Sequence, residues 1–183
     1  MVPLTMLWLP ILVSALFVFL ASNILSMALP FWHRSDFAKL PDEKTVLDAL
    51  SAAKSGQYMV PSLDWGKITP EQRAEMHRAP MALLLLRNPA TFNVGKILTL
   101  WFFYAIVISI FVAYLTGLAR PAGTPYLEVF RVAGAAAVLA YTFRTIPEGI
   151  WFGKPWRIVF KEMIDGTIYG LLTAGAFGWL WPK

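Results

Sequence analysis

Three ionisable side chains inside otherwise apolar stretches are the residues of this sequence best suited to chemistry: Glu128, Arg131 and Asp165. A charge at the centre of a bilayer costs roughly 2.5–3.5 kcal/mol on insertion scales, so such residues are candidates for a functional site. Glu128 and Arg131 are three positions apart on one helix face, and we expect them to pair. We expect Asp165 to form a local salt bridge with Lys161. The alternatives are a proton or ligand site at the first pair and catalysis at Asp165.

The usual ligands of transition metals and haem are scarce. The chain has no Cys, which excludes disulfides, thiolate metal sites, iron–sulfur clusters and thiol nucleophiles. Its two histidines lie outside the apolar stretches, and we interpret His33 as an interfacial residue and His77 as a solvated surface residue. Phosphate-loop, nucleophile-elbow and zinc-protease motifs are absent from the sequence. We therefore expect no metal, no haem and no other cofactor, and nothing positive indicates an enzyme.

Composition indicates the elements that must carry these residues. Of 183 residues, 57% are hydrophobic and 15% charged, against about 25% charged in soluble domains. Four stretches are apolar and near the length of about 20 residues that crosses a bilayer: residues 4–29, 97–119, 126–143 and 163–181. The sequence therefore predicts an all-α integral membrane protein with four transmembrane helices, formed by residues 1–29 and 97–183.

Two of these stretches have more than one interpretation. A cleaved secretory signal is the alternative for the first, but its length and the absence of Lys or Arg before it favour a retained span. Residues 155–163, which precede the fourth, form either an interfacial turn or the beginning of one long helix.

The distribution of positive charge predicts the orientation. Loops on the cytoplasmic side of a membrane are enriched in Lys and Arg. Ten such residues flank the spans on one side: Arg34, Lys39, Lys44, Arg78, Arg87, Lys96, Arg144, Lys154, Arg157 and Lys161. The other side has Arg120 and Lys183. Both termini are thus predicted to be periplasmic. The net charge of +5 reflects this topology, and we expect no nucleic-acid partner.

Residues 30–96 are predicted to form a small cytoplasmic α+β insert between the first and second spans. Apolar residues from position 42 to 54 follow one helix face, which we expect to stop at Gly56. Thr69, Pro70 and Gln72 have the pattern of a capped helix start, which predicts a short helix to about Arg78. Residues 57–60 and 81–86 are the candidate strands.

Small residues recur every four positions on two spans. The fourth span carries Gly166, Gly170, Ala174 and Gly178, and the second carries Ala105, Ser109, Ala113 and Gly117. Small residues allow helix backbones to approach closely in a membrane. We favour packing within this chain for the second span. For the fourth, packing within the chain and docking on another protein are equally supported. The polar cluster of Ser22, Asn23 and Ser26 on the first span should bond across to another helix.

Three stretches carry a resemblance to other proteins: Phe31-Trp32-His33-Arg34-Ser35-Asp36, Gln57-Tyr58-Met59-Val60-Pro61 and Gly175-Ala176-Phe177-Gly178-Trp179-Leu180-Trp181-Pro182. With these, the chain resembles a group of small, uncharacterised bacterial polytopic membrane proteins along nearly its whole length. The resemblance implies an inner-membrane location and bacterial origin, but no activity, ligand or catalytic residue.

Two functional hypotheses follow. The leading one is a non-catalytic accessory or scaffold subunit of a larger membrane complex, with the lipid bilayer and other membrane protein chains as partners. The alternative is a small membrane transporter or membrane enzyme that acts on a lipid or quinone-like molecule.

Overall fold

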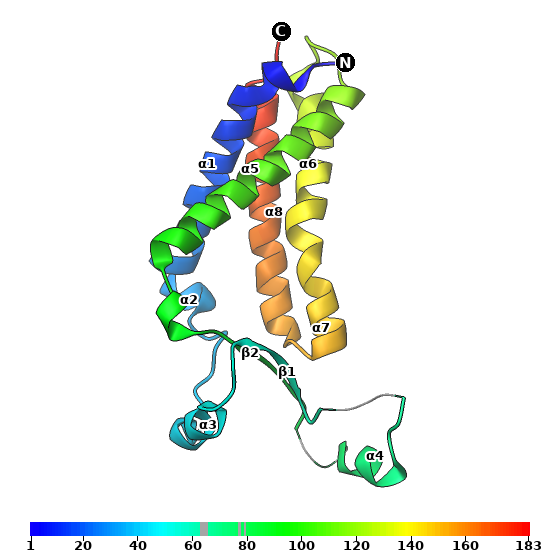
Figure 1. The fold of residues 1–183 in the computed structure, drawn as a ribbon. Helices are drawn as coiled ribbons and strands as arrows, with labels where there is room; N and C mark the ends of the chain where they lie inside the picture. Colours follow the sequence, from blue (N-terminus) through cyan, green and yellow to red (C-terminus); the bar gives the residue numbers. More distant parts are fainter. Residues whose placement is uncertain (63–65, 77, 79) are drawn as a thin grey trace. The chain divides into compact units, whose positions relative to one another are not determined.

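The computed structural model describes residues 1–62, 66–76, 78 and 80–183 (Figure 1). The chain is mostly helical and separates into two compact units. The helical unit consists of Met1–Ala38 and Gly95–Lys183, and the insert consists of Lys39–Val94. Residues 30–38, which the sequence analysis assigned to the insert, thus belong to the helical unit. The reason is a set of polar contacts that ties this segment to the last long helix.

Four long helices build the helical unit. They are α1 (Trp8–Asn23), α5 (Val94–Ala119), α6 (Tyr126–Thr142) and α8 (Trp156–Trp179). A 3-10 turn, Leu4–Leu7, precedes α1, and a π-helical turn, Ile24–Ala28, connects it to the short helix α2 (Pro30–His33). Another 3-10 turn, Phe143–Thr145, and helix α7 (Ile146–Phe152) lie between α6 and α8. Because α8 begins at Trp156, residues 156–163 are helical and extend the predicted fourth span toward its N-terminus.

Among the described residues, three segments are long and apolar enough to cross a membrane: Trp8–Ala28, Val94–Ala119 and Tyr126–Phe152. They indicate a multi-pass membrane protein. Helix α8 has 24 residues, a length of about 36 Å at 1.5 Å per residue, but it is not among the three. Its first half carries charged Lys161, Glu162 and Asp165, which lower its mean hydropathy.

Helices α6 and α8 pack closely because glycine removes side chains between them. A Cβ atom at Gly166 would lie 2.6 Å from the Tyr141 carbonyl oxygen, and one at Gly170 would lie 2.5 Å from Val138 Cγ2. All four residues of the small stripe on α8 are buried. The face that the sequence left open between two partners is therefore occupied within this chain, mainly by α6.

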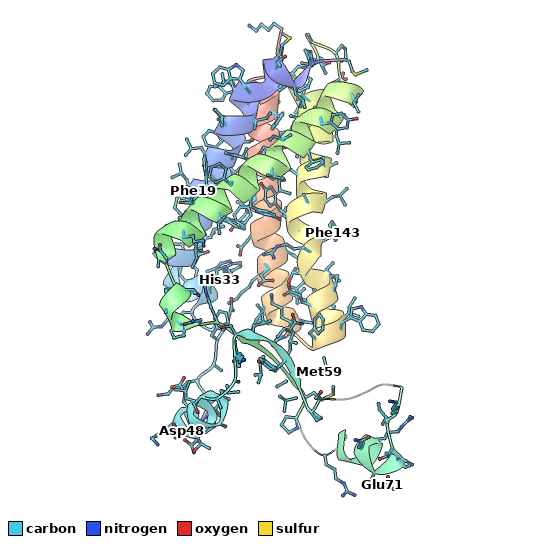
Figure 2. The ribbon with its side chains drawn as sticks, in the orientation of Figure 1. Phe19, His33, Asp48, Met59, Glu71 and Phe143 are labelled. Atoms are coloured by element: carbon cyan, nitrogen blue, oxygen red, sulfur yellow. The ribbon has the colours of Figure 1, made fainter. Side chains whose placement is uncertain are left out.

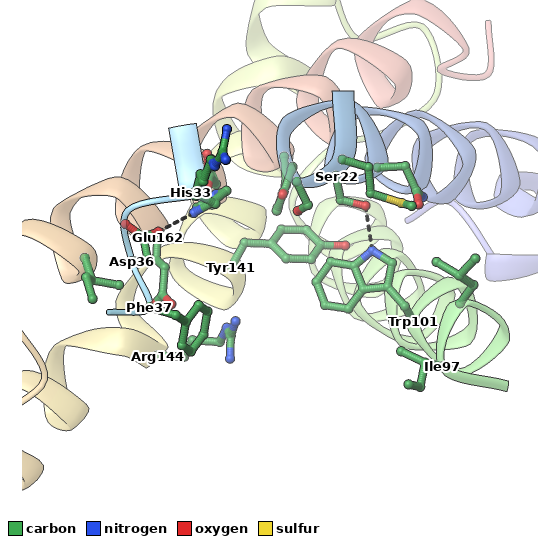
Figure 3. Close-up of a pocket in the computed structure, with 18 of the residues that line it drawn as sticks. Ser22, His33, Asp36, Phe37, Ile97, Trp101, Tyr141, Arg144 and Glu162 are labelled. Carbon is green, nitrogen blue, oxygen red and sulfur yellow. Dashed lines mark hydrogen bonds and ion pairs between the residues drawn. The ribbon is translucent and has the colours of Figure 1, made fainter. Parts of the chain in front are cut away.

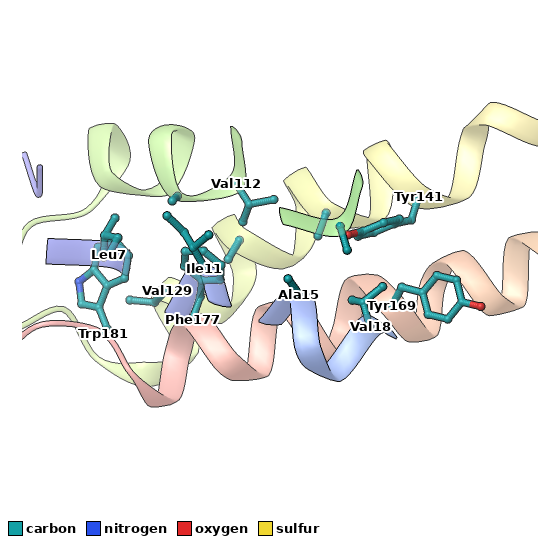
Figure 4. Close-up of a cluster of buried hydrophobic side chains, with 14 of the residues drawn as sticks. Leu7, Ile11, Ala15, Val18, Val112, Val129, Tyr141, Tyr169, Phe177 and Trp181 are labelled. Carbon is teal, nitrogen blue, oxygen red and sulfur yellow. The ribbon is translucent and has the colours of Figure 1, made fainter. Parts of the chain in front are cut away.

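The small stripe of α5 also faces the interior of the helical unit. Ala105, Ser109 and Ala113 are fully buried. The Ser14 hydroxyl of α1 donates a 2.9 Å hydrogen bond to the Ser109 hydroxyl, which joins α1 to α5. Around these contacts, apolar side chains from α1, α5, α6 and α8 form one cluster (Figure 4). Phe143, in contrast, is exposed and points away from the helices (Figure 2).

Both termini lie at the same end of the helical unit (Figure 1). The Val2 amide donates to the Gly117 carbonyl at 3.0 Å, and the Gly123 amide donates to the Pro182 carbonyl at 2.9 Å. The approach of the Val2 carbonyl requires a glycine at 117, because a Cβ there would lie 2.6 Å from this oxygen. The chain thus begins and ends beside the α5–α6 loop.

The insert has the predicted order of helix, strand, helix, strand: α3 (Glu43–Leu50), β1 (Gly56–Val60), α4 (Pro70–Met76) and β2 (Ala82–Leu86). The strands pair antiparallel, with Gly56 opposite Leu86 and Val60 opposite Ala82. The capping box is confirmed, because the Thr69 amide donates to Gln72 Oε1 and the Gln72 amide donates to Thr69 Oγ1. The predicted helix stop at Gly56 is wrong: α3 ends at Leu50, and Gly56 begins β1.

Candidate functional site

His33 lies between two carboxylates at the end of the helical unit opposite the termini. Its Nδ1 is 2.6 Å from Asp36 Oδ2, and its Nε2 is 2.8 Å from Asp165 Oδ2. The carboxylates are nearly buried, with side-chain exposures of 4% for Asp36 and 8% for Asp165. The two ring nitrogens of His33 thus each contact a different carboxylate. His33 thereby fastens the segment after α1 to α8.

Asp165 and Lys161 each contact this segment, and the predicted salt bridge between them is wrong. Trp32 Nε1 donates to Asp165 Oδ1 at 2.8 Å. Lys161 Nζ donates to Asp36 Oδ1 at 2.8 Å and to the Trp32 carbonyl. One turn earlier, Arg157 Nη2 donates to the Ser35 carbonyl at 2.8 Å. These three α8 residues lie at intervals of four on one helix face, where the segment supplies better-placed partners than their own neighbours.

The Asp36 carboxyl has a pKa below its usual value. Burial alone would raise this pKa, but the hydrogen bonds and charges of Lys161 and His33 lower it by more. The carboxylate form of Asp36 is thus the one that the surrounding groups stabilise.

A second ionic cluster joins α7 to α8. Lys154 Nζ lies 2.7 Å from Glu148 Oε2 and 2.6 Å from Glu162 Oε2. The Thr145 hydroxyl also donates to Glu162. Burial alone would lower the pKa of Lys154, but hydrogen bonds to the two glutamates outweigh it and raise the pKa above its usual value. Glu148 therefore helps hold the turn before α8.

A cavity of about 920 Å³ opens between these clusters and the helices (Figure 3). Its lining combines ionic, aromatic and aliphatic side chains from α1, α2, α5, α6, α8 and the turns next to them. The lining residues are Ser22, Asn23, Ser26, Met27, His33, Arg34, Asp36, Phe37, Ile97, Leu98, Trp101, Tyr141, Arg144, Lys154, Ile158, Glu162, Asp165, Gly166 and Tyr169. This composition suits an amphipathic molecule better than a purely polar or purely apolar one.

Aromatic side chains form one wall of the cavity. The Tyr141 ring packs edge-on against Tyr104 and Tyr169, with centroid distances of 6.2 and 5.8 Å. The ring centroids of Trp101 and Tyr169 lie 6.4 Å apart. Trp101 Nε1 donates to the Ser22 hydroxyl at 2.7 Å. This last bond confirms that the polar cluster of α1 reaches another helix through Ser22. These contacts hold the rings in fixed positions around the cavity.

The Tyr141 hydroxyl has no hydrogen-bond partner among the described residues. The residue is only 4% exposed, and Figure 3 shows its hydroxyl pointing across the cavity toward Trp101. Leaving a buried polar group without a partner costs about 1–3 kcal/mol, so such groups call for an explanation. A ligand that accepts or donates a hydrogen bond here would remove this cost.

The structure separates the other predicted site residues. Glu128 lies 3.6 Å from Arg120 Nε instead of pairing with Arg131. Arg131 is exposed and does not line the cavity. Of the three charged candidates, Asp165 alone belongs to the cavity wall. His77 lies outside the described residues.

Several site residues were missed from the sequence. The sequence predicts His33 as an interfacial residue and Arg144 as a topology charge, and it gives no role to Asp36 or Tyr141. A usable signal was present: Arg157, Lys161 and Asp165 form a charged stripe on one face of an otherwise apolar helix, which requires polar partners from elsewhere in the chain.

Within the described part of the chain, no group of three or more His, Asp or Glu side chains is placed to hold a metal ion. No protein-family model matches the sequence, and neither a curated protein nor a solved structure matches the chain.

Proposed function

We propose that this chain binds a lipid-soluble amphipathic molecule, a lipid or a quinone-like compound, in the cavity at the end of its helical unit. It would handle this molecule as a small transporter or membrane enzyme. The observation that carries the proposal is the Tyr141 hydroxyl, buried in the cavity wall without a partner among the described residues.

The arrangement of the lining supports an amphipathic ligand. Trp101, Tyr141 and Tyr169 offer aromatic surface against which a ring or an acyl chain can pack. Arg34 and Arg144 contribute charged groups to the same cavity. A molecule with one apolar and one polar part would contact both kinds of surface at once.

The small-residue surface of α8 that suggested an accessory subunit is buried within this chain. The accessory-subunit hypothesis was argued in part from the small-residue face of α8, which could dock on another protein. This face is buried against α6, where Gly166 and Gly170 contact the backbone of residues 138–142. Association with other chains stays a prediction, but the cavity now supports the alternative more strongly.

We also propose that all four long helices cross a bacterial inner membrane, with both termini periplasmic and the insert cytoplasmic. The position of both termini at one end of the helical unit supports an even number of crossings. The excess of Lys and Arg next to the opposite end supports the orientation. The bacterial assignment is based on the resemblance described above. In this arrangement the cavity lies near the cytoplasmic interface, where a headgroup and a hydrocarbon chain meet.

Native mass spectrometry of the full chain, purified in a mild detergent, tests the binding proposal. The wild-type protein should retain a lipid-soluble molecule. Tyr141→Phe should lower the retained fraction roughly two- to tenfold, because a hydrogen bond contributes a net of about 0.5–1.5 kcal/mol.

Tyr114→Phe is the matched control. Tyr114 lies on α5 and is 51% exposed, so the loss of its hydroxyl should leave retention unchanged. Equal retention by all three proteins would remove the role of Tyr141, and absence of any retained molecule would overturn the proposed function.

A further inference from the structure

The acidic residues of the cavity wall already have hydrogen-bond partners within the chain. Asp36 is bound by Lys161 and His33. Asp165 is bound by His33 and by the Trp32 indole. None of these carboxylates is therefore available to neutralise a further positive charge in the wall.

The third acid of the wall, Glu162, is bound in the same way. It accepts hydrogen bonds from Lys154 at 2.6 Å and from Thr145. Lys154 also contacts Glu148, so two glutamates share this one lysine. The lysine of the wall thus belongs to a closed ionic cluster.

Two arginines of the cavity wall have no acidic partner among the described residues. Arg34 and Arg144 both line the cavity. Neither has a hydrogen-bond or ion-pair partner within residues 1–62, 66–76, 78 and 80–183. Both arginines are exposed to solvent. Within the described wall, the guanidinium groups of Arg34 and Arg144 are therefore the positive groups without a direct acidic partner.

Arg144 lies near the residue with the unpartnered phenol, Tyr141. Arg144 follows Tyr141 by three positions, which places both on the same side of the chain as it leaves α6. Figure 3 shows Arg144 below Tyr141 and next to Phe37. Positive residues flanking a span also serve topology, but topology alone does not require them to line a cavity that contains a buried, unpartnered hydroxyl.

We propose, building on the function proposed above, that the ligand is a membrane lipid with a phosphate headgroup. The guanidinium groups of Arg34 and Arg144 bind the phosphate, since their fork of N–H donors matches phosphate oxygens. The Tyr141 hydroxyl donates a hydrogen bond to an oxygen of the same lipid. The apolar part of the lipid packs against Trp101 and Tyr169.

The test uses the full chain in nanodiscs or mild detergent, with phosphatidylglycerol and phosphatidylcholine of identical acyl chains added in turn. The wild-type protein should retain the anionic lipid roughly tenfold better, because phosphate charge is not offset by choline. The double variant Arg34→Gln/Arg144→Gln should bind the two lipids equally. Arg131→Gln removes an exposed arginine of α6 outside the cavity and should keep the preference.

Two further ligands test whether the bound anion is a phospholipid, a free phosphate ester or a carboxylate. Glycerol 3-phosphate, which has the phosphate but no hydrocarbon chain, should not displace the bound lipid, and displacement would overturn the proposal in favour of a free phosphate ester. Preferential binding of oleate would overturn it in favour of a carboxylate.

The two proposals fail in different ways. Equal retention of both phospholipids that still depends on Tyr141 would overturn the headgroup inference and leave the proposed function standing. Retention of neither would overturn both.

Discussion

His33 Nε2 lies 2.8 Å from Asp165 Oδ2, although 132 positions separate the two residues. This contact, together with the bond from Trp32 to the same carboxylate, connects the end of the first candidate span to the middle of α8. The segment that it anchors supplies Arg34, Asp36 and Phe37 to the cavity wall. The shape of the cavity therefore depends on Asp165.

Replacing Asp165 should destabilise the helical unit. Asp165→Ala leaves the donors of Trp32 and His33 without their acceptor, and breaking a buried pair in this way costs about 3–5 kcal/mol. Asp165→Asn keeps an acceptor for Trp32 and should lose less. Thermal unfolding of the detergent-solubilised protein measures the difference. Asp48→Asn, which alters an exposed pair with Lys44, should change stability by less than about 1 kcal/mol.

Adding a methyl group at Gly170 should lower the stability of this chain even when no other protein is bound. A Cβ at this position would lie 2.9 Å from the Val138 backbone nitrogen, and overpacking of this kind costs about 1–3 kcal/mol. Gly175→Ala is the control, because its Cβ would meet nothing closer than the Tyr126 hydroxyl at 3.8 Å. If Gly170→Ala unfolds at the wild-type temperature but loses co-purifying proteins, the accessory-subunit hypothesis regains its support.

The anchor of the segment should open in acid. Because the pKa of Asp36 is lowered below its ordinary 3.8, its contribution to stability is complete above that value and is lost as the pH falls through the lower folded value. Spin labels at Phe37→Cys and Phe160→Cys, both on exposed positions, should give one narrow distance distribution at pH 5 and a broad one below the folded pKa.

A matched variant keeps this pH prediction testable. Adding Asp36→Asn to the doubly labelled protein should give the broad distribution at neutral pH, because the amide has no charge to pair with Lys161. A narrow distribution for this variant at pH 7 would show that Asp36 does not hold the segment.

The orientation can be tested because the chain has no native Cys. A Cys in place of Ser55, in the insert, should resist a membrane-impermeant maleimide in intact cells and react after lysis. A Cys in place of Ala122, in the loop beside the termini, should react in both. The reverse pattern would place the insert outside the cytoplasm.

The elements with local signals were predictable from the sequence. The helix start at Pro70 depends on Thr69 and Gln72, which are three residues apart. Each strand coincides with a short, uninterrupted stretch of the sequence that was itself predicted as a strand. The stripe of small residues on α8 predicted a close contact with another helix. Small residues allow close approach to many different helices, so this pattern could not identify α6 as the partner.

The candidate site depends on contacts between distant parts of the chain. Lys161 and Asp165 have the spacing of a local salt bridge, yet each bonds to residues 32–36 instead. Spacing shows which partners are available within one helix and carries no information about competing partners from another segment. The unpartnered state of the Tyr141 hydroxyl likewise emerges only once four helices surround it.

The central claim is that the cavity binds a lipid. Cross-linking the protein to the lipid that it retains tests this claim most directly. Cells that produce the protein are grown with a fatty acid carrying a diazirine, and the protein is purified in mild detergent, so that tightly bound lipid remains. After illumination, peptide mapping should locate adducts at cavity residues such as Leu98, Trp101 and Tyr141. Adducts confined to the outward-facing α5 residues Val107, Phe111 and Leu115 would contradict lipid binding in the cavity.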